Sequence, residues 1–192
     1  MESNTKQNNK IETFDVDGNT YKYINGKYYD EHYCVLPKSE MLKVIRARIE
    51  QVDYKSLSAD DIIILIKECK DNEVYTLAKT ISEYALKSDI LNIRQVRTLL
   101  PIFSSCCRST NMPQEAIEKC KIYLIQYPGA FSPMLDTSLA AAYCDIMDYD
   151  NARKYINRAY AQSAHLSIED RRQISLVYKR IQSETGTITS KF

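Results

Sequence analysis

The chain has 192 residues, which suffices for one sizeable core or for one helical array with a small appendage, but not for several large domains. With 26 basic and 25 acidic side chains the formal net charge is +1, so the overall field does not steer the protein toward nucleic acid or an anionic membrane. Only four glycines and five prolines occur, which disfavours a fold made of many tight turns and favours long helices.

The first ten residues are polar and are expected to form a disordered tip, because no apolar core follows a basic start as in a signal peptide. The longest apolar run, Ile62 to Ile66, is far shorter than a membrane span. Six cysteines occur without CxxC spacing and are expected to be reduced thiols. These features predict a cytoplasmic protein.

Residues 11–36 alternate with a period of two and predict an antiparallel β-meander. One turn is expected around Gly18-Asn19, and a type I′ turn at Asn25-Gly26, where both central residues take positive φ. These turns would set Phe14 and Val16 opposite Tyr23 and Tyr21.

The aromatic face of this meander is completed by Tyr28, which is expected beside Tyr23. A lone meander is marginal in water unless its apolar face is covered, so we expect this face to lie on the first helices and to close the N-terminal end of a helical array. Tyr29 falls on the opposite face beside Lys22 and Lys27, and is the tyrosine predicted to contact a partner.

After Pro37 the period changes to 3.6, which predicts a helical array over residues 37–184 and a frayed tail over 185–192. The run from Ile62 to Ile66 could form a buried strand on its own, but a cap before it and charges after it favour a helix. Caps are expected at Ser58, Asn92, Asn111, Ser132 and Ser167. Eight helices follow, beginning near residues 39, 58, 74, 92, 111, 132, 148 and 167.

The segment from Ser138 to Ala161 resembles a tetratricopeptide repeat. Its first helix carries the large-small pair Leu139-Ala140 and the aromatic Tyr143, and its second helix carries the small, large and small residues Ala152, Ile156 and Ala159. Hairpins recurring at about 34 residues are similar to the spacing of that family.

A second unit, over residues 97–128, fits the family less well. Tyr123 stands where the family prefers alanine, and Pro101 lies inside the first helix. The resemblance implies a mainly α fold: an array of antiparallel helical hairpins in a tetratricopeptide-like superhelix, preceded by the β-meander.

In this family the groove lined by the first helices binds a segment of another protein, and the resemblance implies such a groove here. Projected onto this chain, the inward positions are Thr98, Ser105, Arg108, Met134, Thr137, Ala141 and Cys144. This lining suits an extended or helical segment with apolar anchors.

We find no motif for catalysis and expect no cofactor. His32 and Cys34 form a two-ligand fragment, whereas a zinc site needs three or four ligands, so a surface histidine is the favoured interpretation. The sequence therefore predicts a non-enzymatic interaction module, an adaptor or regulatory subunit that binds a protein partner.

Two alternatives stay open. The first is a nucleic-acid-associated regulator that uses basic residues of the first and last helices, namely Lys38, Lys43, Arg46, Arg48, Arg171, Arg172, Lys179 and Arg180. These residues are interleaved with acids, as on solvated faces, so direct nucleic-acid binding is not the favoured interpretation. The second is self-association through an exposed last hairpin.

Overall fold

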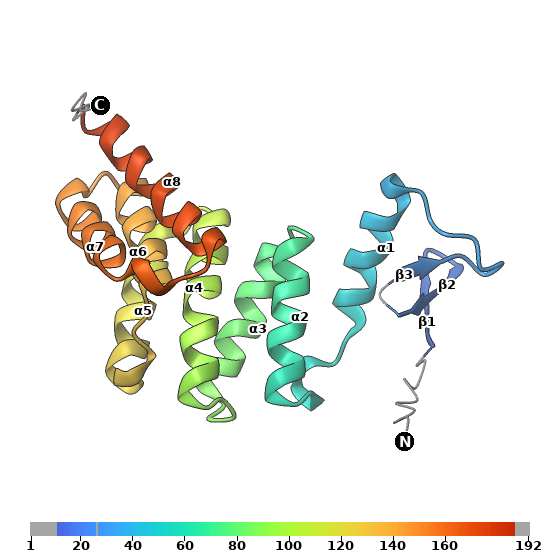
Figure 1. The fold of residues 1–192 in the computed structure, drawn as a ribbon. Coiled ribbons are helices and arrows are strands. Elements are labelled where there is room, and N and C mark those ends of the chain that lie inside the picture. Colours follow the sequence, from blue (N-terminus) through green and yellow to red (C-terminus); the bar gives the residue numbers. More distant parts are fainter. Residues whose placement is uncertain (1–10, 26, 187–192) are drawn as a thin grey trace, which may run out of the picture. The chain divides into compact units, whose positions relative to one another are not determined.

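The computed structural model describes residues 11–25 and 27–186, and Figure 1 shows its course. In these residues the chain forms a three-stranded sheet and eight α-helices, so the prediction of a mainly helical protein with a small N-terminal meander is confirmed. The chain divides between Asp53 and Tyr54 into two compact units, which we describe separately. The expected disordered tip, and the expected tail beyond Gly186, lie outside the described residues.

The sheet consists of β1 (Glu12–Val16), β2 (Asn19–Ile24) and β3 (Lys27–Tyr29), paired antiparallel in the order β1-β2-β3. The second turn agrees with the sequence, since Ile24 pairs with Lys27 and Asn25 has φ 52°. Gly26, the other residue predicted there, lies outside the described residues.

The first turn differs from the prediction by one residue. It consists of Asp17 and Gly18, with φ 51° and 80°, and not of Gly18 and Asn19. Aspartate tolerates the left-handed region nearly as well as asparagine, so the type I′ turn forms one position earlier. Phe14 therefore pairs with Tyr21 and not with Tyr23, a register shift of two that keeps the aromatic residues on one face.

Helix α1 (Lys38–Gln51) belongs to the same unit as the sheet and contacts β1, whereas the sequence assigned it to the helical array from residue 37. The expected packing of the aromatic face on the first helix is present. The residues buried in this unit are Phe14, Val16, Tyr21, Tyr28, Leu36, Val44, Ile45 and Ile49.

Arg48 of α1 fastens the helix to the sheet. Its guanidinium donates to both carboxylate oxygens of Glu12, at 3.2 and 2.8 Å, and lies 4.3 Å above the ring of Tyr23. The Tyr21 hydroxyl donates to Glu40 at 3.0 Å, and burial together with this carboxylate raises the pKa of Tyr21. The half-buried ring of Tyr23 thus lies between the Arg48 guanidinium and the ring of Tyr28, whose centroid is 4.9 Å away.

The second unit contains seven α-helices in its described part. Their bounds are α2 (Ala59–Asp71), α3 (Tyr75–Lys87), α4 (Ile93–Ser109), α5 (Pro113–Gln126), α6 (Pro133–Asp145), α7 (Tyr149–Ala161) and α8 (Ile168–Glu184). Short 3-10 turns lie at Tyr54–Ser56, Pro128–Ala130 and Ser163–His165. No helix in the described ranges combines the length and apolarity that crossing a membrane requires.

Four of the predicted caps form as expected. The side chains of Ser58, Asn92, Ser132 and Ser167 accept backbone N–H groups at the starts of α2, α4, α6 and α8. The prediction for Asn111 is wrong, because α5 begins after Met112, and Asn111 adopts φ 58° at the end of α4.

Asn111 is one of three residues that end a helix in the same way. Glu73, Asn111 and Met147 each have positive φ, and each donates its N–H to the carbonyl three residues earlier. In each case the following residue donates to the carbonyl five residues before it. This is the Schellman arrangement, and it joins α2 to α3, α4 to α5, and α6 to α7 by the same turn.

The helices pack in succession. Each odd-numbered helix from α3 to α7 contacts the helices before and after it, and α2, α4, α6 and α8 contact one another in order. Helix α6 is buried almost all round because α4, α5, α7 and α8 surround it. Figure 1 shows α8 running obliquely across α6.

Candidate functional site

A cavity of about 510 Å³ lies between α4, α6 and α8, and we call it the α4/α6 groove. The predicted groove residues that line it are Thr98, Ser105, Arg108, Met134, Thr137 and Ala141. The structure thus brings six of the seven together on one hollow surface.

The seventh residue, Cys144, lies elsewhere. It is 2% exposed beneath α8, and its thiol donates to the Glu184 carboxylate at 3.0 Å. Burial and this carboxylate raise the pKa of Cys144 to about 11, so the thiol stays protonated at neutral pH. Cys144 anchors the last helix and does not face the groove.

Helix α8 forms a wall that sequence reasoning missed. Ile174 and Ile181 are buried and hold α8 against its neighbours, while Gln173 and Val177 line the groove. The sequence assigned this helix to an exposed last hairpin, because a local pattern does not say which helix an amphipathic stripe packs against.

The floor of the groove is mostly uncharged, and hydrogen bonds tie its hydroxyl groups to the backbone. Thr137 is 4% exposed, and its hydroxyl donates to the carbonyl of Pro133 at 2.8 Å. The Ser138 hydroxyl donates to the carbonyl of Pro101 at 3.3 Å, which ties α6 to α4. The partly buried Ile102, Met134 and Val177 supply apolar surface around this floor.

The rim is basic. Lys70, Arg97 and Arg108 line the groove together with one acid, Asp170. Arg97 donates to the carbonyl of Gly129 at 2.7 Å, which holds its guanidinium in place. A partner segment that brings carboxylates to this rim would be favoured over one that brings cations.

Asp145 organises one end of the rim by binding two guanidinium groups. Arg108 Nε and Arg180 Nη1 each donate to it at 2.6 Å. Burial alone would raise the pKa of Asp145, but the two guanidinium groups outweigh it and lower the pKa. The ion pairs fix α4, α6 and α8 relative to one another.

The sequence also singled out Tyr29, His32 and Cys34, which belong to the N-terminal unit. Tyr29 is half-buried and pairs with Lys22 across the sheet, with a further bridge to Val35. His32 and Cys34 are exposed, and His32 Nε2 lies 3.3 Å from Glu31. In the described ranges no three metal-binding side chains gather.

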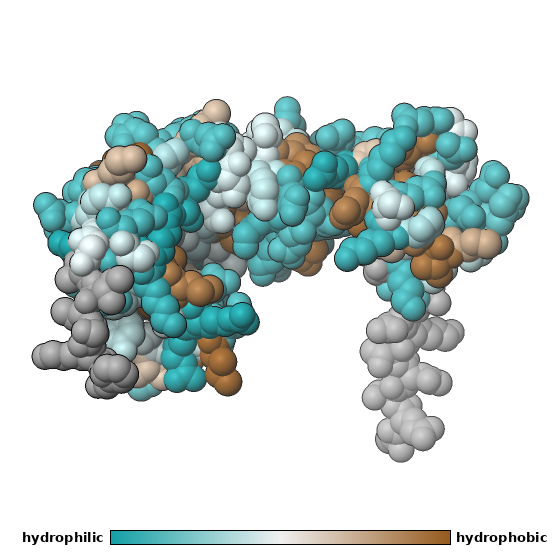
Figure 2. Space-filling view, turned by 90° about the horizontal axis from the view of Figure 1, so that it is seen from above, coloured by the Kyte–Doolittle hydropathy of each residue, from teal (hydrophilic) through white to brown (hydrophobic). Residues whose placement is uncertain are grey.

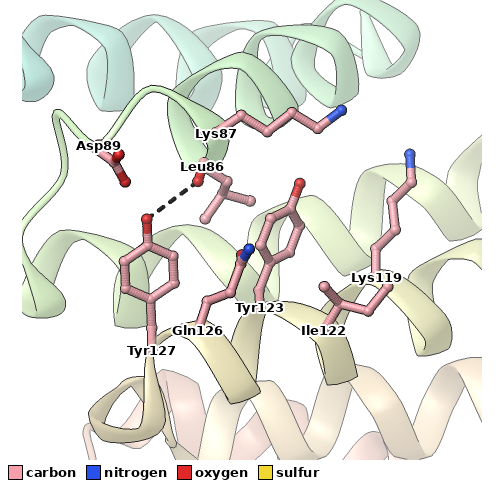
Figure 3. A pocket seen from close by; sticks show the side chains of 8 residues that line it. All are labelled: Leu86, Lys87, Asp89, Lys119, Ile122, Tyr123, Gln126 and Tyr127. Atoms are coloured by element: carbon pink, nitrogen blue, oxygen red, sulfur yellow. Dashed lines mark hydrogen bonds between the residues drawn. The ribbon is translucent and has the colours of Figure 1, made fainter.

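A second hollow of about 470 Å³ lies between the end of α3 and helix α5, and we call it the α3/α5 trough (Figure 3). Sequence reasoning did not predict it. The available signal was Tyr123, which stands where the tetratricopeptide pattern has alanine. The lining residues are Leu86, Lys87, Asp89, Lys119, Ile122, Tyr123, Gln126 and Tyr127.

Apolar side chains also reach the surface outside these hollows. Figure 2 shows a mostly hydrophilic face on which brown apolar patches stand apart from one another. Ile125 of α5 and Ile168 of α8 are both 79% exposed. Isolated apolar residues are ordinary on a protein surface, so we assign a role only to those beside a hollow.

Comparison of the chain with protein-family models, with curated proteins and with solved structures gave no match.

Proposed function

We propose that the second unit is a tetratricopeptide-like array that binds a segment of another protein in the α4/α6 groove. The protein would act as a non-enzymatic adaptor or regulatory subunit. Its six cysteines, none in a disulfide in the described residues, suit the cytoplasm, where we place it.

The turns support the repeat. Glu73, Asn111 and Met147 close three hairpins with one hydrogen-bond pattern, although they are three different residue types and only asparagine favours positive φ. A shared backbone geometry without a shared residue is expected when the packing of the two helices dictates the turn.

The contacts between neighbouring hairpins also support a repeat architecture. Gln95 donates to Asp60 and Lys79 to Glu115, pairs that are 35 and 36 residues apart, and Arg108 binds Asp145 37 residues on. Contacts at one nearly constant sequence spacing are typical of stacked repeats, in which each unit touches its neighbours. The residues that carry the resemblance are all buried: Leu139, Ala140, Tyr143, Ala152, Ile156 and Ala159.

The observation that carries the proposal is the groove itself. Polar and apolar side chains both line it, hydrogen bonds tie its floor to α4 and α6, and its rim is basic. Its volume falls within the usual range for binding pockets, about 300–1,000 Å³. An extended or helical segment with one or two apolar anchors would bury Ile102, Met134 and Val177. Carboxylates beside those anchors would meet the rim.

The nucleic-acid alternative gains no support from the ion pairs. Lys43 lies 2.5 Å from Asp17, Arg48 binds Glu12, and Arg180 binds Asp145 and Glu184. A nucleic-acid surface requires cations gathered on one face and available to phosphates. Several of the basic residues considered for that role are already paired with acids.

The test is affinity purification of the tagged chain from its native host. We expect a stoichiometric protein partner that stays bound at about 0.5 M salt, because apolar anchors are not screened. Met134→Asp in the groove should reduce recovery about tenfold. Met147→Asp is the matched control, since Met147 is 75% exposed in the turn after α6.

Three results would contradict the proposal. The partner could persist in Met134→Asp, or nucleic acid could be retained with a steep dependence on salt. Size-exclusion chromatography with light scattering could also show that the chain binds only itself.

A further inference from the structure

Pro101 lies on the wall of the α4/α6 groove and deprives one backbone carbonyl of its usual partner. Helix α4 continues through Pro101, from Ile93 to Ser109 (Figure 1). In an α-helix the carbonyl of Arg97 accepts from the N–H of residue 101, but proline has no N–H. The proline ring also clashes with that carbonyl and pushes it outward. Because Arg97 and Pro101 both line the groove, this hydrogen-bond acceptor lies at the groove wall.

A proline in the middle of a 17-residue helix is unfavourable, and no structural gain offsets it. Ser138 on α6 donates to the carbonyl of Pro101 at 3.3 Å. This bond uses the backbone, so it would also form in Pro101→Ala and does not require the proline. A residue that breaks a local rule without a structural gain is expected at a functional site. We therefore connect Pro101 with what the groove binds.

The hydroxyl groups of the groove add further acceptors. Thr98, Thr137 and Ser138 line the groove, and each hydroxyl donates to a backbone carbonyl at a distance between 2.8 and 3.3 Å. A hydroxyl has one proton and two lone pairs, so a hydroxyl that donates to the backbone can only accept from a ligand. Together with the Arg97 carbonyl, these groups of α4 and α6 offer acceptors to an occupant of the groove.

These acceptors discriminate between a helical and an extended occupant. In a helical segment the backbone N–H groups beyond the first turn are already bonded within the helix, so they cannot reach the groove wall. In an extended segment the backbone N–H groups are free, and those of every second residue point to one side. The groove runs along α4 from Arg97 to Arg108, about 16 Å at the rise of an α-helix, which an extended chain covers in about five residues.

From these observations we propose that the α4/α6 groove holds its partner as an extended segment, whose backbone N–H groups donate to the acceptors of α4 and α6. Pro101 favours such a segment because it frees the carbonyl of Arg97. The inference rests on the function proposed for the groove and narrows it, since it excludes a helical occupant. Apolar side chains of the extended segment pack on Ile102, Met134 and Val177. Pro101 is thus a specificity-determining residue of the groove.

The test uses peptides from a random library displayed on phage, selected against the full chain and kept only if Met134→Asp binds them more weakly. Each peptide is then synthesised as a series in which one backbone N–H at a time is replaced by an ester oxygen. We expect at least one ester to weaken binding to the wild type about fivefold, as the loss of a neutral hydrogen bond implies. That ester should have little effect on binding to Pro101→Ala, because the N–H of residue 101 then occupies the Arg97 carbonyl.

Pro113→Ala is the matched control. Pro113 is the first residue of α5, where a helix needs no N–H, so this substitution should leave peptide binding and the effect of each ester unchanged. Thermal unfolding should show that Pro101→Ala is at least as stable as the wild type, because the helix gains a hydrogen bond. A lower melting temperature would show that the proline serves packing and would count against the proposal.

The outcomes separate this inference from the proposed function. The inference is overturned by peptides that depend on Met134 but tolerate every ester. It is also overturned if each ester weakens binding to the wild type and to Pro101→Ala by the same factor. In both cases the proposed function of the groove still stands. If no selected peptide depends on Met134, the groove does not bind a protein segment and both proposals fail.

Discussion

Asp136 and Arg158 form a buried ion pair whose disruption gives a measurable prediction. Asp136 on α6 is 1% exposed, and both of its carboxylate oxygens accept from the guanidinium of Arg158 on α7, with the Nε bond at 2.6 Å. The guanidinium also lies 4.5 Å from the ring of Phe131 and 4.9 Å from that of Tyr155. Arg158→Met would keep much of the volume and remove the charge.

The loss of stability in Arg158→Met comes from the Asp136 carboxylate, which stays buried without its partner. Removing one partner of a buried pair leaves an uncompensated charge and typically costs about 3–5 kcal/mol. The Arg158 side chain is 39% exposed, so we take the lower end, about 3 kcal/mol. For a unit of this size the melting temperature should fall by about 12 °C.

The pH dependence distinguishes a buried charge from lost packing. Burial raises the pKa of Asp136, although Arg158 lowers it in part. Without Arg158 the pKa rises further, and the folded state then binds a proton more tightly than the unfolded state. The stability from that proton is present below the ordinary carboxyl pKa and is lost as the pH rises through the folded-state pKa. The penalty should therefore be largest at neutral pH and should shrink on acidification.

Urea unfolding followed by circular dichroism measures both effects, with Arg171→Met as the control on the exposed face of α8. Adding Asp136→Leu to Arg158→Met should recover more than half of the loss, because no buried charge remains. The reasoning would be refuted if Arg158→Met lost the same free energy of unfolding at neutral and at acidic pH. It would also be refuted if the double variant recovered none of that loss.

Further predictions concern other parts of the chain. Asp145→Asn should lower the free energy of unfolding by about 2 kcal/mol at neutral pH, as measured by urea titration. The difference from wild type should vanish on acidification, because the pKa of Asp145 is lowered in the folded state and the stability that this gives is lost as the pH falls through that pKa. Tyr28→Ala should lower the stability of the sheet by about 3 kcal/mol, because Tyr28 is buried, whereas Tyr29→Ala, at a half-buried position, should lower it by less than about 1 kcal/mol. Hydrogen exchange of the β2 backbone amides measures both losses, and equal losses would contradict the register. A native thiol assay should label Cys34 and leave the five buried cysteines unreacted until denaturant is added.

Local features were the most predictable from the sequence. Ser58 and Asn92 cap α2 and α4 as expected because a cap depends only on the next three residues. The first β-turn was misplaced because Asp17-Gly18 and Gly18-Asn19 can both form a type I′ turn, and nothing local decides between them.

Long-range packing was less predictable. The position of α8 against α6 depends on which apolar stripe meets which groove, and a stripe such as Ile174 and Ile181 fits several partners. The repeat pattern predicted six residues of α4 and α6 that line the groove. It did not predict that α8 covers Cys144. The α3/α5 trough arises because Tyr123 departs from the pattern that guided the prediction.

The nearly constant spacing of the contacts between hairpins also bears on how the second unit opens. Asp60 with Gln95, Glu83 with Lys119 and Asp145 with Arg180 close chain loops of almost equal length, so each costs about the same entropy to form. Because each of these contacts joins neighbouring hairpins and none joins distant ones, hairpins can dock one after another, and refolding should be fast. When the second unit is pulled from its ends, it should unfold one hairpin at a time from an end. The hairpin with the weakest interface should unfold first.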